Sequence, residues 1–374
     1  MSTSCSQNIA VIGAGIAGAA CARALTLAGH SVNVFDKSLG PGGRLATRRF
    51  EWLDPQGQAF TTRVDHGAVG ITARSALFQN FIDQARQAGW LVEWAPTLQA
   101  GSLPIGGGRL YVSVPDMPAL CHHLLEGSAT NWSFAVDSLH RSTLGWQLQA
   151  IGARPSAAFD AVVLALPPAQ AAPLLYQHRS DWARHATVAP MQPCWTLMGV
   201  ARAPAENPEC SLGWDLARPP TGPLDWVLRN DARPGRERVP GQAHWVAHAR
   251  AGWSRRHLEQ PPEWVRQQLQ AAMAETLGRA VDWHHCTVHR WRFALPHAHR
   301  VGPTESCWWD AAQSLGVCGD FLGGVGVEGA WLSAQSLAAA LLPRASALAA
   351  VPTAFARHES AHETNHSSAR RLAA

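Results

Sequence analysis

The sequence predicts an α/β protein with two kinds of sheet: a parallel sheet covered by helices, and a mostly antiparallel sheet in a separate α+β domain. Apolar segments followed by Gly-rich turns and Ala-rich helices occur near both ends, at residues 9–27 and 315–342. This order is the pattern of strand–turn–helix units in a parallel sheet. Between them, residues 180–299 are rich in Trp and Pro, with alternating segments such as 195–201 and 244–249. Alternation of this kind is typical of antiparallel strands.

The first strand–turn–helix unit has the spacing of a dinucleotide-binding turn. A short apolar strand at residues 9–12 is followed by Gly13, Gly15 and Gly18 in G-x-G-x-x-G spacing. In a Rossmann-type turn the first glycine permits the tight turn, the second admits a pyrophosphate, and the third allows close packing of helix on strand. The helix N-terminus then binds the phosphates. The next strand ends at Asp36, whose carboxylate is expected to accept hydrogen bonds from ribose.

A Gly-Gly-Arg sequence favours FAD over NAD as the dinucleotide. Gly42, Gly43 and Arg44 lie shortly after Asp36. The glycines let the chain pass close to a phosphate, and the guanidinium can bind that phosphate bidentately. The series G-x-G-x-x-G, Asp and Gly-Gly-Arg resembles the FAD-binding signature of the amine oxidase and renalase superfamily. We therefore expect FAD, bound noncovalently because no Cys or His is placed against the ring.

The composition limits the class of protein and its partners. The 374 residues are 47% hydrophobic, which is normal for a soluble globular protein, and the formal net charge is +4. No basic run is present, so we expect no nucleic-acid partner. The eight cysteines include no C-x-x-C pair, which argues against a zinc site or a disulfide framework. The absence of a signal-peptide pattern and of a long apolar run predicts a cytoplasmic protein without membrane contact.

The chain is expected to return to its dinucleotide-binding domain several times. We assign residues 1–80, 105–175 and 300–343 to the FAD-binding domain, residues 81–104 and 176–299 to a substrate domain, and residues 344–374 to a flexible C-terminal tail. The predicted helices are residues 75–89, a segment from about residue 117, 262–277 and 330–342; the other predicted elements are a hairpin over 132–139 and 146–151 and a strand at 159–166.

Further motifs give a resemblance over most of residues 8–342. They are RVDHGAVGIT, RLYVSVPDMPAL, FDAVVLALPP, HARAGWSRRHLEQPPEWV, HRWRFALP and CGDFLGGVGVEGAWLSAQSLAAAL. The GD sequence is shared by many FAD proteins, whereas HRWRFALP with VEGAWLS is much narrower. With these motifs the chain resembles the bacterial renalase-like flavoproteins, a branch of the amine oxidase superfamily.

The resemblance implies a set of FAD-binding residues. Asp36 and Lys37 would lie at the adenosine ribose, Arg44 at the pyrophosphate, and the backbone of Val136 at adenine. Asp320 would bind the ribityl or phosphate region, and the helix opened by residues 327–330 would point its positive end at the flavin pyrimidine. The implied cofactor-binding residues are Gly13, Ala14, Gly15, Gly18, Asp36, Lys37, Gly43, Arg44, Gly67, Ala68, Val136, Gly319, Asp320 and Val327.

The resemblance also implies a reaction and a substrate-binding side. Such enzymes take a hydride from the mis-reduced 2- or 6-dihydro isomers of NAD(P)H, release NAD(P)+, and pass the electrons to molecular oxygen as hydrogen peroxide. The residues expected on the substrate side are Ala68, Val69, Gly70, Ile71, Thr72, Arg109, Tyr111, Trp195 and Trp291. Loss of hydride from a dihydronicotinamide leaves no proton to remove, so no catalytic acid or base is assigned.

Two polar residues of the HRWRF sequence are candidates for a pocket. They are His289 and Arg292. Alternation along a strand would put His289, Trp291 and Phe293 on one face, and Arg290 and Arg292 on the other. Either face is an equally reasonable substrate wall. The chain departs from the family where Arg is usual before VEGA, because Gly326 stands there, and where Val69 and Gly70 replace aromatic and Gln residues. These departures weaken the substrate prediction more than the FAD prediction.

Two other functions remain open. An amine oxidase is the nearest, but such enzymes place a lysine beside the flavin, and the one lysine here is Lys37, at the adenosine end. A flavin-binding protein without this activity is the second, and Gly326 favours it. A pyridine-nucleotide disulfide reductase is excluded, since a second G-x-G-x-x-G and a redox Cys pair are lacking.

The histidines do not predict a metal site. His358 to His362 match H-E-x-x-H, with His366 four residues on, but this sequence lies in a polar tail without a scaffold for a third ligand. His297 and His299 have no carboxylate or Cys cluster beside them in the sequence.

Overall fold

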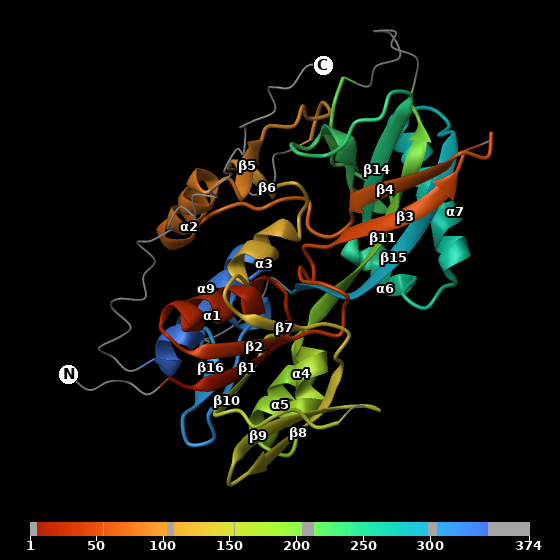
Figure 1. Ribbon diagram of the computed structural model, residues 1–374. Helices are drawn as coiled ribbons and strands as arrows, with labels where there is room; N and C mark the ends of the chain where they lie inside the picture. Colours follow the sequence, from red (N-terminus) through yellow and green to blue (C-terminus); the bar gives the residue numbers. More distant parts are fainter. Residues whose placement is uncertain are drawn as a thin grey trace, which may run out of the picture.

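The computed structural model describes residues 6–54, 56–102, 108–152, 154–203, 213–297 and 305–342. They form two parts that lie side by side, one built on a six-stranded, largely parallel sheet and the other on a five-stranded antiparallel sheet (Figure 1). This arrangement confirms the predicted fold class. The predicted tail at residues 344–374, with its H-E-x-x-H sequence, and His299 lie outside the described residues.

The first sheet has the strand order β16-β17-β10-β1-β2-β7. All neighbours in it are parallel except β16, which runs antiparallel to β17. Its strands are β1 (Asn8–Ile12), β2 (Ser31–Phe35), β7 (Ala129–Asn131), β10 (Ala161–Leu164), β16 (Trp308–Asp310) and β17 (Leu315–Val317).

Both faces of the parallel sheet are buried, and successive residues of β1 face opposite sides. Ile9 and Val11 pack in the core that contains α1 (Ile16–Leu27) and α9 (Gly326–Leu341). Ala10 and Ile12 pack in a second core with residues of helices α4 and α5 and hairpin β8–β9. These covering elements are α4 (Pro168–Leu175), α5 (Ser180–Val188), β8 (Val136–Ser142) and β9 (Gly145–Ala150). Burial on both sides explains why the parallel strands are continuous apolar segments.

The antiparallel sheet has the order β12-β13-β14-β11-β15. Its elements are β11 (Met191–Arg202), β12 (Leu216–Ala217), β13 (Leu224–Arg229), β14 (Gln242–Ala249), β15 (Trp283–Pro296), the short helix η3 (Asn230–Ala232), α6 (Ala251–Arg256) and α7 (Pro262–Leu277). Helix α7 has the predicted bounds: Pro262 opens it, and Gly278 ends it with a left-handed φ of +66°. Leu269 and Met273 of α7 are buried in the core formed with one face of this sheet.

A hairpin that was not predicted covers the other face of the antiparallel sheet. It consists of β3 (Thr47–Leu53) and β4 (Ala59–Asp65). Phe50 stacks on His285 of β15 with ring centroids 4.6 Å apart, and Trp52 stacks on His284 at 5.2 Å. Residues 1–80 were predicted to belong to the FAD-binding domain, yet this part of the range packs on the antiparallel sheet (Figure 1).

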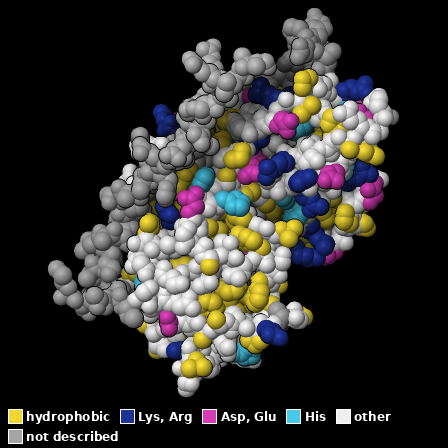
Figure 2. Space-filling model, viewed as in Figure 1, with side chains coloured by type: hydrophobic (Ala, Val, Ile, Leu, Met, Phe, Trp, Pro, Cys, Tyr) yellow, Lys and Arg dark blue, Asp and Glu magenta, His cyan; other side chains and the backbone are white. Residues whose placement is uncertain are grey.

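The two parts differ in the charge that they carry on the face seen in Figure 2. Most of the Lys and Arg side chains visible there lie over the antiparallel part, and acidic side chains lie among them (Figure 2). Arg49 and Glu51 of β3 are one such exposed pair, 3.3 Å apart. The basic residues on this face are therefore interspersed with residues of opposite charge.

The remaining elements are α2 (Ala76–Gln87), α3 (Ala119–Leu124), α8 (Asp320–Gly323) and the pair β5 (Leu91–Trp94) and β6 (Leu110–Ser113). The predicted helix at 75–89 is confirmed, with the Ser75 hydroxyl accepting a hydrogen bond from the Phe78 amide at 3.3 Å. Helix α9 starts at Gly326 rather than at the predicted residue 330. None of the described helices has the length and apolar character needed to cross a membrane.

Candidate functional site

Glycine is sterically required at two positions of the turn between β1 and α1. A Cβ on Gly18 would lie 1.8 Å from the carbonyl oxygen of Gly13, so the helix packs directly on the turn. Gly13 itself has φ +106°, and a Cβ there would lie 2.5 Å from the oxygen of Ala165. The roles predicted for the first and third glycines therefore correspond to contacts in the structure.

Gly15 differs from these two glycines because a Cβ there would make only ordinary van der Waals contacts. A Cβ on Gly15 would meet nothing closer than the Cα of Gly43, at 3.9 Å. Gly15 is also the N-cap of α1, and no side chain caps the helix. The amides at the start of α1 and the adjacent backbone of Gly43 therefore form a candidate cradle for a phosphate group. Such a helix start is suited to an anionic group, so these residues fit a pyrophosphate.

The carboxylate of Asp36 is tied to the same turn. It accepts hydrogen bonds from the amide of Ala14 at 2.7 Å and from the amide of Ser38 at 2.8 Å. The amide of Phe134 donates to the Asp36 carbonyl at 2.9 Å, which brings the chain just before Val136 to this end of β2. Lys37 is exposed beside Asp36. Asp36 and Lys37, predicted at the adenosine ribose, therefore lie beside Ala14 and beside Phe134, two residues before Val136.

Arg44 and Asp320 form a bidentate ion pair. The two guanidinium nitrogens lie 2.6 and 2.8 Å from the carboxylate oxygens of Asp320, which is 2% exposed. Arg44 also donates to the carbonyl of Ala294 in β15 at 3.0 Å. Two residues 276 positions apart, both predicted to bind the cofactor, thus meet where the parallel sheet adjoins the antiparallel sheet.

The predicted cofactor residues Gly319 and Val327 lie around Asp320. The Gly319 amide donates to the Ser333 hydroxyl at 3.0 Å. Val327 is in the first turn of α9, whose N-cap Val325 provides no capping side chain. Helices α8 and α9 touch closely, because a Cβ on Gly329 would lie 1.6 Å from the Gly324 oxygen.

Residues 66–70 run beside the chain around Arg44. The amides of His66 and Gly67 donate to the carbonyl of Ala46 at 3.0 and 3.3 Å, and the amide of Ala68 donates to the carbonyl of Arg44 at 2.9 Å. A Cβ on Gly67 would lie 2.0 Å from the Arg44 oxygen, so only glycine permits this approach. Gly67 and Ala68, predicted near the flavin ring, are therefore placed directly against the predicted cofactor-binding arginine.

The carbonyls of the same segment are held by side chains of the other part of the molecule. The His66 carbonyl accepts hydrogen bonds from Trp291 Nε1 and His248 Nε2, both at 3.3 Å. Arg233 Nη2 donates to the carbonyl of Val69 at 2.6 Å and reaches that of Ala68 at 3.5 Å. The segment is therefore fixed between the chain around Arg44 and side chains of the antiparallel part.

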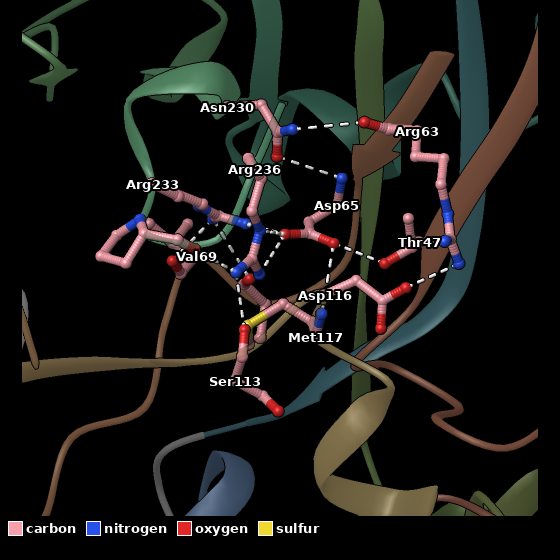
Figure 3. A network of polar contacts seen from close by, with 12 residues as sticks. Thr47, Arg63, Asp65, Val69, Ser113, Asp116, Met117, Asn230, Arg233 and Arg236 are labelled. Atoms are coloured by element: carbon pink, nitrogen blue, oxygen red, sulfur yellow. Dashed lines mark hydrogen bonds and ion pairs between the residues drawn. The ribbon is translucent and has the colours of Figure 1, made fainter. Parts of the chain in front are cut away.

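Asp65, directly before this segment, is the centre of a buried polar network (Figure 3). Its carboxylate is paired with Arg233 at 3.1 Å and with Arg236 at 2.5 Å, and it also accepts from the Thr47 hydroxyl and the Met117 amide. Burial raises the pKa of Asp65, but the two guanidinium groups outweigh burial and lower it below the usual range. Asp65 is therefore a carboxylate at neutral pH.

Three aromatic rings form a cluster against this segment, which we call the His66 cluster: His66, His289 and Trp291. Trp291 stacks on His66 with ring centroids 5.0 Å apart and planes at 26°, and His289 meets His66 edge-on at 4.9 Å. Burial lowers the pKa of His66 to about 3 and that of His289 to about 4. The imidazoles of the cluster are thus uncharged at neutral pH, and His289 lies edge-on to the stacked rings of His66 and Trp291. The Nδ1 atom of His66 is buried and has no partner among the described residues.

These buried imidazoles predict a loss of stability in mild acid. Burial also lowers the pKa of His248, to about 4, whereas an unfolded histidine titrates near 6.5. Below pH 6.5 the unfolded chain therefore binds more protons, and stability falls as the pH falls from 6.5 toward 4. Each buried histidine contributes a slope approaching about 1.4 kcal/mol per pH unit.

We expect His248→Gln, which keeps a donor for the His66 carbonyl, to reduce this slope by about one such contribution. Urea unfolding at about pH 7, 6 and 5 measures it. Equal slopes for the variant and the wild type would contradict a neutral buried His248.

The predicted substrate residues are only partly brought together. Ala68 and Val69 lie beside the His66 cluster, and Trp291 belongs to it. Ile71 and Tyr111 are paired through their backbones at 2.8 Å in both directions, but their side chains are fully buried in the main core. Gly70 and Thr72 flank Ile71 in this segment, and a Cβ on Gly70 would lie 2.4 Å from Leu110. Arg109 is exposed, 3.6 Å from Glu93.

Trp195 and Arg292 lie on the opposite face of the antiparallel sheet from Trp291. Trp195 is buried beneath α6 and donates from Nε1 to the His257 carbonyl at 3.0 Å. Arg292 is paired with the exposed Glu259 at 2.6 Å, as is Arg290 at 2.9 Å. The predicted alternation along β15 is confirmed for these residues, and it separates the two candidates Trp195 and Arg292 from the His66 cluster.

Of the residues that hold the 66–70 segment, Trp291 was predicted at the site and the others were not. Asp65 and His66 are part of the quoted motif RVDHGAVGIT, so their position before Gly67 was a usable signal. Arg233 and Arg236 had none, because they lie far along the chain from the segment and outside the quoted motifs, whereas His248 opens the quoted motif HARAGWSRRHLEQPPEWV.

Gly326, the residue that departs from the family pattern, has a left-handed φ of +82°, and a Cβ added to it would meet no atom within 4 Å. The guanidinium of Arg74 lies close by, donating to the Val325 carbonyl at 3.0 Å and to Glu328 at 3.1 Å. A cationic side chain therefore lies at the start of α9 even though residue 326 provides none. This side chain, that of Arg74, comes from the segment that follows Thr72.

We expect Gly326→Ala to destabilise the protein by about 1–2 kcal/mol, because an L-residue at this φ is strained. Gly252→Ala is the control: Gly252 lies in α6 with open space around it, and alanine there should stabilise by about 0.5–1 kcal/mol. The free energy of unfolding in urea distinguishes them. Equal stability of Gly326→Ala and wild type would show that the start of α9 accepts a side chain.

Comparisons with known proteins agree with this architecture. The family of NAD(P)-binding Rossmann-like domains matches residues 11–85. Three solved structures are similar over most of their length. One is a protein from Exiguobacterium sp. 255-15 proposed to be a protoporphyrinogen oxidase, with a TM-score of 0.65, 14% identity, and coverage of 90% of this chain and 99% of that one.

The second is an oxidoreductase from Methanosarcina mazei, with a TM-score of 0.61, 14% identity, and 88% and 99% coverage. The third is the cyclohexylamine oxidase of Brevibacterium oxydans IH-35A, with a TM-score of 0.57, 13% identity, and 90% and 99% coverage. At these identities the likeness shows the fold. The chain shares the two-part architecture of these proteins over most of its length.

Proposed function

We propose that this chain is an oxidoreductase that uses noncovalent FAD to oxidise mis-reduced 2- or 6-dihydro isomers of NAD(P)H, yielding NAD(P)+ and hydrogen peroxide. The observation that carries the proposal is the proximity of the Gly15 and Gly43 backbones to the Arg44–Asp320 pair and the 66–70 segment. FAD, when bound, would accept the hydride and return the electrons to molecular oxygen.

Different residues of the chain would bind different parts of the elongated dinucleotide. The amides at the start of α1 would hold the pyrophosphate, and Asp36 would bind the ribose of adenosine. Arg44 lies at the far side of the cradle, where its guanidinium can contact phosphate while Asp320 orients it. The start of α9 at Val327 would direct its positive end toward the flavin, which favours an anionic reduced form.

The His66 cluster suits a flat, oxidisable substrate. Trp291, His66 and His289 present neutral rings, so a dihydronicotinamide would be positioned by stacking rather than by proton transfer. Departure of a hydride from such a ring produces an aromatic cation and requires no base. This agrees with imidazoles whose low pKa values keep them uncharged at neutral pH.

An amine oxidase is the second candidate, because the aromatic rings of the His66 cluster could also surround an alkyl amine. The similarity to the cyclohexylamine oxidase supports this alternative. Lys37, the one lysine of the chain, is exposed beside Asp36 and far along the chain from the 66–70 segment. A flavin-binding protein without either activity is the third possibility.

The test is anaerobic reduction of the purified holoprotein. The oxidised-flavin band is followed after addition of NAD(P)H isomer mixtures made by nonspecific reduction, with ordinary NADH and a panel of amines in parallel. We expect rapid bleaching by the isomers and reoxidation by air with peroxide release. Bleaching by an amine would support the amine oxidase instead, and bleaching by none of them would overturn both activities. Absence of bound flavin would overturn the proposal altogether.

A further inference from the structure

The ion cluster of Asp65, Arg233 and Arg236 carries more positive than negative charge. Asp65 is 1% exposed, and the side chains of Arg233 and Arg236 are 0% and 5% exposed. No other acidic side chain of the described residues lies within ion-pair distance of either guanidinium. Arginine side chains carry their charge in proteins at neutral pH, and burial lowers the pKa of Arg233 only to about 10. The cluster therefore has one uncompensated buried positive charge.

Stability alone does not account for this charge. Burying an unpaired cation costs free energy, and one arginine would be enough to neutralise Asp65. The Nε atom of Arg233 is also buried without a partner among the described residues. A second arginine that raises this cost points to a role outside the cluster itself.

The cluster contacts the segment predicted to lie against the flavin. Arg233 binds the carbonyls of Ala68 and Val69, while the amide of Ala68 binds the Arg44 carbonyl. A single residue, Ala68, therefore lies between Arg233 and the chain that forms the cofactor site. Arg236 holds Arg233 indirectly, through their shared partner Asp65 and through the Ser113 and Pro234 carbonyls at 2.6 and 2.7 Å (Figure 3).

We propose that Arg233 and Arg236 are positioning residues for the bound flavin: Arg233 fixes the 66–70 segment, and the excess charge makes the flavin easier to reduce. This inference rests on the proposed function. Two-electron reduction adds negative charge to the flavin, and a nearby buried cation stabilises that charge. We expect one such buried unit charge to change the reduction equilibrium by roughly tenfold.

Arg236→Met tests the electrostatic part. The variant leaves Arg233 and Asp65 as a neutral pair and keeps the contacts of Arg233 with the Ala68 and Val69 carbonyls, so it is expected to fold. We expect the reduced flavin to be stabilised about tenfold less, which lowers the two-electron midpoint potential by about 30 mV. FAD affinity, measured by flavin fluorescence, should stay within about threefold of wild type.

Arg233→Lys tests the positioning part. Lysine keeps the charge but loses the fork that binds two carbonyls and Asp65 together. We expect about tenfold weaker FAD binding with a midpoint potential close to that of the wild type. Arg266→Met is the matched control, because Arg266 is paired with the exposed Glu263 on α7. Arg266→Met should change neither the FAD affinity nor the midpoint potential.

The outcomes separate this inference from the proposed function. Wild-type potential in Arg236→Met together with wild-type FAD affinity in Arg233→Lys would overturn the inference and leave the function standing. A wild-type protein that binds no FAD would overturn both. If Arg233→Lys fails to fold, the potential of Arg236→Met decides alone.

Discussion

Asp65→Ala should lower the free energy of unfolding by about 3–5 kcal/mol, because it leaves two buried guanidinium groups without their counter-charge. Arg233 and Arg236 have no other acidic partner in the part of the chain that the structure describes. The Thr47 hydroxyl and the Met117 amide also lose their acceptor. Urea unfolding at neutral pH, followed by tryptophan fluorescence, measures the loss.

Glu259→Ala is the matched control for this experiment. Glu259 also pairs with two arginines, Arg290 and Arg292, but it is 67% exposed. Solvent screens exposed pairs of this kind, so the control should lose far less stability than Asp65→Ala. Equal losses in the two variants would show that burial does not distinguish the two ion clusters.

The pH dependence of Asp65 gives an independent check. Because the pKa of Asp65 is lower in the folded state, its contribution is present above the unfolded value near 3.8 and disappears as the pH falls through the folded value. The stability difference between wild type and Asp65→Asn should therefore shrink below about pH 4. A difference that stays constant down to about pH 2 would contradict the ion pairing.

Gly15→Ala should abolish tight FAD binding while leaving the fold nearly intact. An alanine fits sterically, since the nearest protein atom lies 3.9 Å from its Cβ and the φ of Gly15 is −75°. The methyl group would, however, occupy the cradle in which the pyrophosphate is expected to approach the backbone. We expect FAD affinity to fall at least about a hundredfold, or about 2.7 kcal/mol.

Gly18→Ala provides the contrast. Its Cβ would lie 1.8 Å from the Gly13 oxygen, so this variant should lose both stability and FAD binding. Fluorescence titration with FAD and urea unfolding of both variants separate the two effects. Normal FAD binding by Gly15→Ala would show that the dinucleotide does not lie over this turn.

Several features were predictable because they depend on neighbours in the chain. The Gly13–Gly18 turn, the bounds of α7 and the alternation of His289 and Trp291 against Arg290 and Arg292 follow from local geometry and hydrophobic period. The β3–β4 hairpin was missed, because its half-exposed strands carry several arginines and lack the continuous apolar pattern of the parallel strands.

The fold class and the glycine-rich turn of this protein follow from its amino-acid order, since backbone sterics and burial periodicity act over a few residues. Which distant side chains meet depends instead on how the two parts pack. Packing joins Arg44 to Asp320 and Asp65 to Arg233, and it places Trp291 against His66 while Trp195 lies on the opposite face. Both faces of the antiparallel sheet carry buried aromatic residues, so composition does not distinguish them. The hairpin and the 66–70 segment pack on one face, and this packing determines which aromatic residues lie beside the segment.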